Sequence, residues 1–190
     1  MTKSSSRNAN RKQQKTILLG VTGSIASYKA CDLINRFRER GFAVKCAMSR
    51  DAKWFITPLT LETLTGEKVA EDMFRLPATR EPAHIALSEE ADIILVAPAT
   101  ADIIAKTASG ICDDILTCAV CSSRCPVVFA PAMNDRMYNN PIIQDRITYL
   151  RGKGYHFVGP VVGRLACGYE GMGHLAPADK IIERVESLLE

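Results

Sequence analysis

The sequence predicts a single α/β domain whose parallel β-sheet is covered by helices on both faces. The first observation is that short, β-branched apolar runs alternate with segments of helical periodicity, the pattern of βαβ units. The second is that runs such as CPVVFA (125–130) are apolar throughout, as in strands buried on both faces. The third is size: 190 residues, 47% of them hydrophobic, suit one domain with a substantial core. The expected class is therefore a single-domain Rossmann-like, flavodoxin-like sheet.

The first 15 residues are expected to be a disordered basic tail, and residues 16–190 to form the domain. The tail is polar and basic, so it cannot bury enough surface to offset the entropy of ordering it. We interpret it as a solubilising segment, with a targeting or lipid-surface role as the alternative. It has no apolar h-region, and the chain has no apolar run of the roughly 18 to 20 residues that cross a bilayer, so no membrane association is expected.

The first half of the domain is predicted to contain, in order, a strand, a tight turn, a helix and a second strand. A β-rich run at 15–23 ends in glycine, and the helix expected at 24–41 has apolar residues at helical spacing before Gly41 closes it. A strand at 42–49 and a helix at 57–66 follow.

The rest of the chain continues the alternation. Residues 71–84 have no period and contain two prolines, which predicts a loop or flap. The later elements are expected, in order, as a helix at 84–91, a strand at 92–100, helices at 101–110 and 113–123, a strand at 125–131, a helix at 141–154, a strand at 155–160, a glycine-rich loop at 159–177 and an amphipathic helix at 177–190.

Charge and cysteine content exclude several functions. With 24 basic and 21 acidic residues the formal charge is +3, which gives no broad nucleic-acid footprint. Seven cysteines without a secretory signal suggest reduced thiols and a cytoplasmic location. Cys118 and Cys121 have C-x-x-C spacing, but positions three apart simply share a helix face, and no second pair or nearby histidine completes a metal site. A structural role is the favoured interpretation.

Small and hydroxylic side chains follow four predicted strands. They are Gly23 with Ser24, Ser49, Thr100, and Met133 with Asn134. In an open α/β sheet, ligands bind across these carboxyl ends. The turn at Gly23 and Ser24 could hold a phosphate, although Ser24 as an ordinary N-cap is an equal alternative. The G-x-G-x-x-G fingerprint of dinucleotide sites and a ligand-spaced set of carboxylates or imidazoles are both missing, so a mononucleotide-like cofactor is favoured over a dinucleotide or a metal.

Two further residues admit both a structural and a catalytic interpretation. Cys167 lies in the glycine-rich loop, where a mobile flap could approach a ligand and a thiol would be accessible enough to react. His84 precedes an apolar helical segment, and on the sequence pattern alone a structural role is favoured over a catalytic one. His156, inside a predicted strand, is interpreted as structural.

Several motifs in order along the chain resemble those of the flavin-containing cysteine decarboxylases. They are VTGSIASYKA (21–30), HI (84–85), ADIILVAPATADIIAKTASGICDDIL (91–116), PAMN (131–134) followed by M-x-x-NP, and LACGYEGMGHLAP (165–177). The resemblance runs from about residue 16 to the C-terminus and is closer to the phosphopantothenoylcysteine decarboxylases of coenzyme A biosynthesis.

The resemblance implies FMN as the cofactor and a cysteine-derived small molecule as the substrate. It also implies a homotrimer or a multiple of trimers, with the active site between subunits. The residues implied to bind FMN are Gly23, Ser24, Ile25, Ser49, Thr100, Ala101, Asp102 and Ile103, with Met133 close to the ring. His84 would be the active-site base, Cys167 a proton donor and Asn134 the partner of the substrate carboxylate. Arg164, Leu165 and Ala166 would belong to a clamp over the substrate. Two residues depart from the family pattern: Tyr138 replaces a common Trp, and His174 replaces the Arg often found in bacterial relatives.

The implied reaction is decarboxylation of 4'-phosphopantothenoylcysteine to 4'-phosphopantetheine without net oxidation. FMN would first oxidise the thiol-bearing carbon, which creates a sink for the electrons that carbon dioxide leaves behind. Cys167 would then protonate the resulting enethiolate before the flavin is reoxidised. The alternatives are decarboxylation of a peptide ending in cysteine, and an FMN-binding regulatory protein without catalytic activity.

Overall fold

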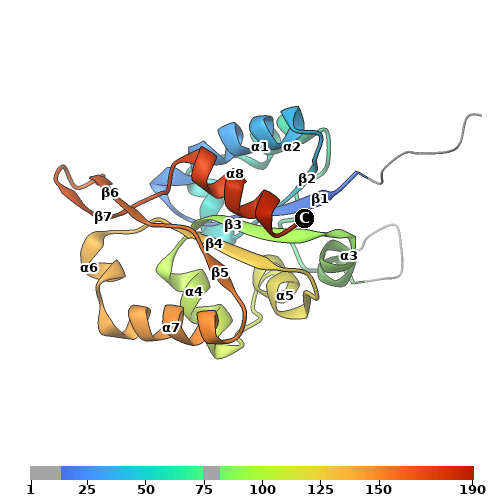
Figure 1. Ribbon diagram of the computed structural model, residues 1–190. Helices are drawn as coiled ribbons and strands as arrows, with labels where there is room; N and C mark the ends of the chain where they lie inside the picture. The colour runs from blue at the N-terminus through green and yellow to red at the C-terminus, as the bar shows by residue number, and fades with distance from the viewer. Residues whose placement is uncertain (1–13, 75–81) are drawn as a thin grey trace, which may run out of the picture.

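The protein, described here for residues 14–74 and 82–190 of a computed structural model, has a five-stranded parallel sheet between two layers of helices (Figure 1). The strand order is β2-β1-β3-β4-β5, the flavodoxin-like order, in which the direction of winding reverses between β1 and β3. The strands are β1 (Thr16–Val21), β2 (Ala43–Met48), β3 (Ile93–Ala99), β4 (Val127–Pro131) and β5 (His156–Phe157). The predicted single-domain α/β class is confirmed.

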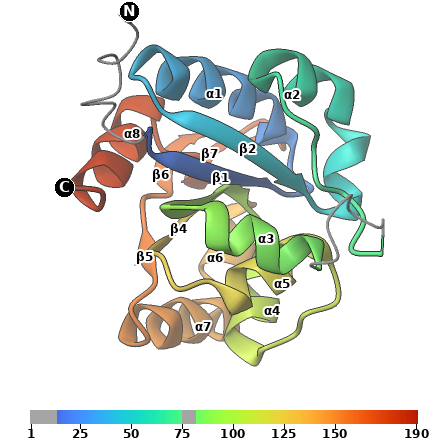
Figure 2. The same cartoon turned by 90° about the vertical axis from the view of Figure 1, so that its right-hand side faces the viewer.

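Two groups of helices cover the two faces of the sheet (Figures 1 and 2). One face carries α1 (Ala30–Glu39), α2 (Pro58–Thr65) and α8 (Ala178–Ser187), and the other carries α3 (Ala83–Glu90), α4 (Ala101–Ser109), α5 (Ile115–Ser122) and α7 (Pro141–Gly152). In β1, Leu19 packs into the first core and Leu18 into the second. Both faces of each central strand are therefore buried. For this reason the strands are apolar throughout instead of alternating between apolar and polar residues.

The long helix expected at 24–41 divides into two parts. A 3₁₀ turn, η1 (Ile25–Lys29), precedes α1. The buried Ser27 hydroxyl donates to the carbonyl oxygens of Thr22 and Ser24, at 2.8 and 2.5 Å. These bonds tie the first turn to the end of β1, so the tight 3₁₀ geometry replaces an α-helical start.

The glycine-rich segment expected as a loop at 159–177 contains an antiparallel hairpin of β6 (Val161–Arg164) and β7 (Glu170–His174), and this expectation was wrong. The hairpin is docked by a hydrogen bond from the Met133 backbone N–H to the Gly173 carbonyl oxygen at 3.0 Å. A Cβ on Gly173 would lie well inside van der Waals contact with the Met133 carbonyl oxygen, so only glycine permits this approach. Two short helices were also not predicted: η2 (Arg50–Trp54) and α6 (Asp135–Tyr138).

Most of the predicted tail and part of the predicted flap, residues 1–13 and 75–81, lie outside the described residues. The last tail residue, Lys15, pairs with Asp92 at 2.8 Å, and its carbonyl oxygen accepts a hydrogen bond from Ala43. Across the described part of the chain, none of the helices combines the length and apolar character needed to cross a membrane.

Candidate active site

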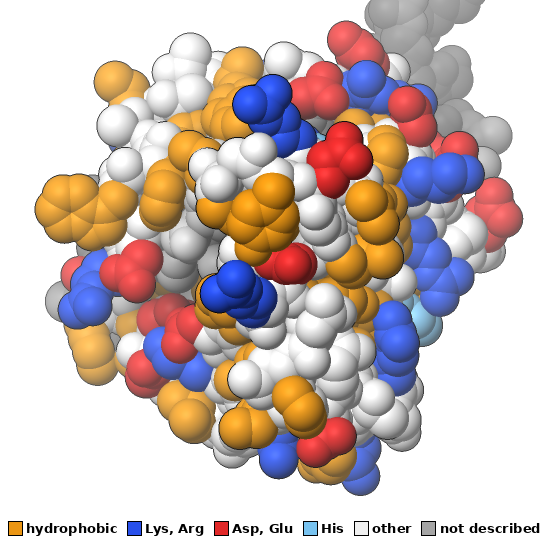
Figure 3. Space-filling view, turned by 90° about the vertical axis from the view of Figure 1, so that its left-hand side faces the viewer, with side chains coloured by type: hydrophobic (Ala, Val, Ile, Leu, Met, Phe, Trp, Pro, Cys, Tyr) orange, Lys and Arg blue, Asp and Glu red, His pale blue; other side chains and the backbone are white. Residues whose placement is uncertain are grey.

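Two adjoining cavities lie at the carboxyl ends of the central strands. The first has a volume of about 600 Å³ and the second about 430 Å³. Gly23, Thr100, Ala101 and Met137 line both, so the cavities share a wall. Figure 3, which faces this edge of the sheet, shows hydrophobic side chains among scattered basic and acidic groups, and the exposed apolar residues that line the first cavity are Ile25, Tyr28 and Met137. The site therefore lies where the parallel sheet predicts it.

The ends of β1 and β3 are joined by one buried hydroxyl group. Thr22, 1% exposed, donates through Oγ1 to the Pro98 carbonyl oxygen at 2.7 Å and accepts from the Thr100 backbone N–H at 3.2 Å. Thr100 in turn caps α4, since its Oγ1 accepts from the Ile103 N–H at 3.4 Å. These bonds fix the backbone on the shared wall of the cavities.

The turn after β1 combines an N-cap with a close backbone approach. Ser24 caps η1 and its Oγ accepts from the Ala26 N–H at 3.3 Å, so the N-cap alternative for Ser24 describes its geometry correctly. A Cβ on Gly23 would lie 2.7 Å from the Asp51 Cβ, so glycine is needed where η2 packs against this turn. Ser49, at the start of η2, faces the second cavity.

The predicted cofactor residues divide between the two cavities. Ser24, Ile25 and Met133 line the first, whereas Ser49, Asp102 and Ile103 line the second. With Gly23, Thr100 and Ala101 on the shared wall, the structure brings together all nine residues that the sequence predicted for the cofactor.

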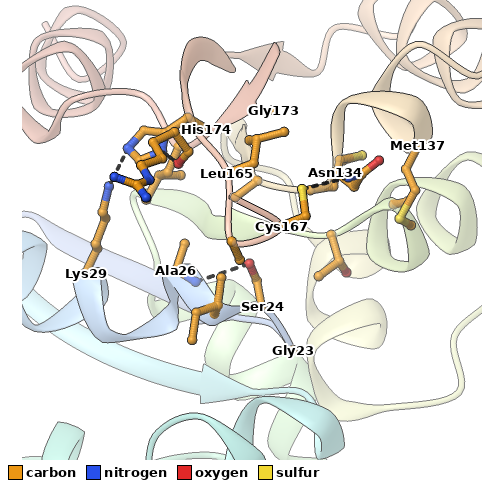
Figure 4. Close-up of a pocket in the computed structure, with 18 of the residues that line it drawn as sticks. Gly23, Ser24, Ala26, Lys29, Asn134, Met137, Leu165, Cys167, Gly173 and His174 are labelled. Atoms are coloured by element: carbon orange, nitrogen blue, oxygen red, sulfur yellow. Dashed lines mark hydrogen bonds between the residues drawn. The ribbon is translucent and has the colours of Figure 1, made fainter. Parts of the chain in front are cut away.

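The opposite wall of the first cavity carries Asn134 and Cys167. Asn134 caps α6 through its Oδ1, which leaves its Nδ2 to donate to Cys167 Sγ at 3.4 Å (Figure 4). The same Nδ2 donates to the Tyr169 hydroxyl at 3.1 Å. The Tyr169 hydroxyl donates to Asp135 Oδ1 at 2.6 Å, and this hydrogen bond raises the pKa of Tyr169 above its ordinary value. The thiol and the amide are therefore adjacent although 33 residues separate them.

Arg164, Leu165 and Ala166, the residues implied for a substrate clamp, line the first cavity beside Cys167. A residue that the sequence analysis did not single out joins them: Lys29 Nζ lies 2.9 Å from His174 Nε2. Its partner is 145 residues away, so no local pattern could have indicated this contact.

His84 is the one predicted site residue that the structure does not bring to either cavity. It lies in the first turn of α3, half-buried, and its Nδ1 is buried without a hydrogen-bond partner in the described structure. An unpartnered ring nitrogen is costly in a folded protein, and His84 Nδ1 lacks a hydrogen-bond partner among residues 14–74 and 82–190.

The C-x-x-C pair lies on α5, as the structural interpretation predicted. Cys118 is buried and its thiol donates to the Cys112 carbonyl oxygen at 3.4 Å, while desolvation raises the pKa of Cys121 to about 12. Such thiols carry little thiolate near neutral pH. Within residues 14–74 and 82–190, no group of three or more His, Cys, Asp or Glu side chains is arranged to hold a metal ion.

Comparison with known proteins gives consistent results for sequence and structure. The profile of the Flavoprotein family matches residues 4–190. The coenzyme A biosynthesis bifunctional protein CoaBC of Vibrio vulnificus (strain YJ016) is 41% identical over 176 residues, which are 93% of this chain and 44% of the relative. The chain thus spans less than half the length of this curated relative.

Solved structures of similar size have the same fold. The FMN-dependent cysteine decarboxylase SpaF is 30% identical with a TM-score of 0.80, and the match covers 93% of this chain and 95% of SpaF. A PPC decarboxylase mutant complexed with pantothenoylaminoethenethiol is 29% identical with a TM-score of 0.83, covering 92% of this chain and 98% of that one. On the extent of these matches, the chain belongs to the Flavoprotein family.

Proposed function

We propose that this chain is an FMN-dependent enzyme that decarboxylates 4'-phosphopantothenoylcysteine to 4'-phosphopantetheine. The observation that carries the proposal is the contact between Asn134 and Cys167, which places an amide donor and a thiol together in one cavity. The relatives named for coenzyme A biosynthesis and the similarity to a PPC decarboxylase support this substrate class.

The residues around the two cavities fit a flavin mononucleotide. Much of the lining of the first cavity is apolar and can accept a flat ring, with Ile25, Met133 and Leu165 among its members. The second cavity adds the hydroxyl of Ser49, and its Lys106 ammonium is paired with Asp102 and Asp113. Gly23 and Ser24, in the turn after β1, line the first cavity and would face the phosphate of the flavin. The missing dinucleotide fingerprint favours a mononucleotide here.

The flavin, when bound, supplies the two-electron oxidation and reduction that neither amide nor thiol can perform. Asn134 has a separate role: its Nδ2 donates to the substrate carboxylate, and a neutral amide does not hold that carboxylate as an ion pair that opposes loss of charge. Cys167, beside it, gives a proton to the carbon that has lost carbon dioxide. The Tyr169 hydroxyl orients the amide through the 3.1 Å contact.

The position of His84 supports a shared active site. His84 lies outside both cavities of its own chain, and its Nδ1 has no partner among the described residues. We propose that it acts as a base in the site of a neighbouring subunit of a homotrimer. Neither His84→Asn nor Cys167→Ser subunits alone should form 4'-phosphopantetheine. Mixing them should restore its formation, to about a quarter of the wild-type rate at equal amounts in a symmetric assembly. Mixtures that stay inactive after exchange of subunits would contradict a shared site.

A peptide ending in cysteine is the second candidate substrate, favoured by the similarity to the FMN-dependent cysteine decarboxylase SpaF. The exposed Ile25 and Tyr28 at the cavity rim would suit the apolar side chains of such a peptide.

The experiment is to load the protein with FMN and to measure carbon dioxide release from 4'-phosphopantothenoylcysteine and from a short peptide with a C-terminal cysteine. We expect a yellow protein that acts on the first compound. A protein that stays colourless after incubation with FMN would refute flavin dependence, and release from the peptide alone would replace the proposed substrate.

A further inference from the structure

Three basic side chains line the first cavity at one place, and we call them the basic corner. Lys29 comes from η1, Arg164 from β6 and His174 from β7. Figure 4 shows Lys29 and His174 on one side of the cavity and Asn134 on the opposite side. The corner is therefore separate from the Asn134–Cys167 contact although both face the same space.

The two contacts of the His174 ring fit one tautomer. A lysine ammonium can only donate, so Lys29 Nζ donates to His174 Nε2 over 2.9 Å. The Nδ1 of the same ring lies 3.2 Å from the Arg164 carbonyl oxygen, which can only accept. Both contacts are satisfied by the neutral tautomer with its proton on Nδ1. His174 therefore holds the Lys29 ammonium in place without adding a charge that repels it.

A glycine makes this arrangement possible. A Cβ on Gly163 would lie 2.9 Å from the His174 Cγ, so the absence of a side chain at this position of β6 makes room for the imidazole ring.

The charges of the corner have no anionic counterpart in the described part of the chain. None of the ion pairs formed by residues 14–74 and 82–190 includes Lys29 or Arg164. Glu170 is opposite Arg164 in the hairpin register, but it does not line the cavity. Two cations with free donors, beside a largely apolar cavity, form a site for an anion with several acceptor oxygens.

We propose that the basic corner binds the phosphomonoester of the substrate, with Lys29 and Arg164 as its ligands and His174 as a positioning residue for Lys29. This inference rests on the proposed function and adds a specificity element to it. The substrate is anionic at both ends, so its carboxylate meets Asn134 while its phosphate meets the corner across the cavity. The enzyme thereby selects phosphorylated over unphosphorylated pantothenoylcysteine. The flavin phosphate is a second source of the same chemistry, and the turn at Gly23 and Ser24, which lines the same cavity, is the alternative place for it. The experiment below distinguishes the two.

Calorimetry on the FMN-loaded protein tests the corner directly, with 4'-phosphopantothenate and pantothenate as probes. Lys29→Gln and Arg164→Gln should each weaken binding of the phosphorylated probe relative to the other by about 10- to 100-fold, the range for a lost charge-assisted hydrogen bond. Lys180→Gln is the control, because it removes an exposed lysine of α8 that does not line the first cavity. It should leave the ratio of affinities unchanged. An unchanged ratio in both corner variants would overturn the proposal.

Two His174 variants separate positioning from packing. The amide oxygen of His174→Gln can still accept from Lys29, whereas His174→Leu cannot. We expect the affinity ratio to fall by about tenfold in His174→Leu and to be largely retained in His174→Gln. Equal ratios in the two variants would overturn the positioning role.

The remaining outcomes separate this inference from the proposed function and from the flavin. Loss of FMN affinity in the Lys29 and Arg164 variants, with the probe ratio unchanged, would assign the corner to the flavin phosphate and overturn the inference. The affinities are measured without turnover, so the expected change in their ratio supports phosphate binding by the basic corner whether or not the enzyme releases carbon dioxide. A failure to release carbon dioxide would count against the proposed function alone.

Discussion

The first cavity has two walls of different construction. The strand-end wall, formed by Thr22–Ser24 and Thr100–Ala101, is held by hydrogen bonds of buried groups, above all the Thr22 hydroxyl. The hairpin wall, residues 164–174, is held by contacts such as Asn134–Tyr169 and Tyr169–Asp135, whose side chains reach solvent. Buried hydrogen bonds thus hold the strand-end wall, whereas Cys167 lies on a segment held by the Met133–Gly173 backbone bond and by contacts of partly exposed side chains.

The largest expected effect comes from displacing the hairpin wall as a unit. In Gly173→Ala, the new methyl group cannot share space with the Met133 carbonyl oxygen, and the hairpin has to move because the neighbouring Ala132 N–H is bonded to Ala99. Turnover should fall by about 100-fold or more, since a displacement of 1 Å in an active site has effects of that size. FMN binding should persist. Measuring flavin content and turnover on the same preparation checks this, and a parallel loss of both would show that the walls are not independent.

The next effect is on stability and belongs to the strand-end wall. Thr22→Val keeps the shape of the side chain but leaves the Pro98 carbonyl and the Thr100 N–H without their buried partner, at a cost of about 1–3 kcal/mol. Thr107→Val is a matched control, because the Thr107 hydroxyl is buried without a hydrogen bond, so its loss should be neutral or stabilising. Urea unfolding of both variants provides the comparison. Equal destabilisation would contradict the special role of Thr22.

The smallest effect on stability is expected for the corresponding hydroxyl of the hairpin wall. Tyr169→Phe removes contacts to Asn134 and Asp135 but should change the melting temperature by less than about 2 °C, because the groups are exposed. KM should rise a few-fold as the amide loses its orientation. A melting temperature lowered as much as in Thr22→Val would remove the distinction between the walls.

The same hydroxyl predicts an alkaline pH dependence. The hydrogen bond to Asp135 raises the pKa of Tyr169 above 10, so the protonated form is the one stabilised in the folded state. This contribution is complete below pH 10 and is lost as the pH rises through the raised value. In that pH range, KM should rise more steeply for the wild type than for Tyr169→Phe. Profiles of KM against pH for the two proteins measure this difference.

The sequence predicted the strand-end wall better than the hairpin wall for a physical reason. In β3 every residue from Ile93 to Ala99 is buried, so burial on both faces appears directly as an unbroken apolar run. The hairpin instead contains glycine, arginine and histidine, and it is held by contacts such as Met133–Gly173 that no local pattern encodes. A glycine-rich stretch therefore looked like a loop.

The candidate site shows the same division. Residues placed by strand ends, such as Thr100 and Asn134, could be predicted because the sheet brings its carboxyl ends to one edge. The place of Lys29 in the site could not be predicted, because it depends on a contact with His174, 145 residues away in the sequence. His84 was identified only through a motif, and its proposed partner lies in another subunit.

The central claim is that the strand-end wall binds the flavin while the hairpin wall supplies the proton through Cys167. A single turnover of FMN-loaded Cys167→Ser with 4'-phosphopantothenoylcysteine, followed by mass spectrometry, tests it most directly. A serine hydroxyl is a far weaker acid than a thiol, so the variant should bind FMN and release carbon dioxide yet stop at the enethiol, two hydrogens lighter than 4'-phosphopantetheine. Formation of 4'-phosphopantetheine at the wild-type rate would contradict the claim, because Cys167 would then not be the proton donor and the hairpin would only cover the site.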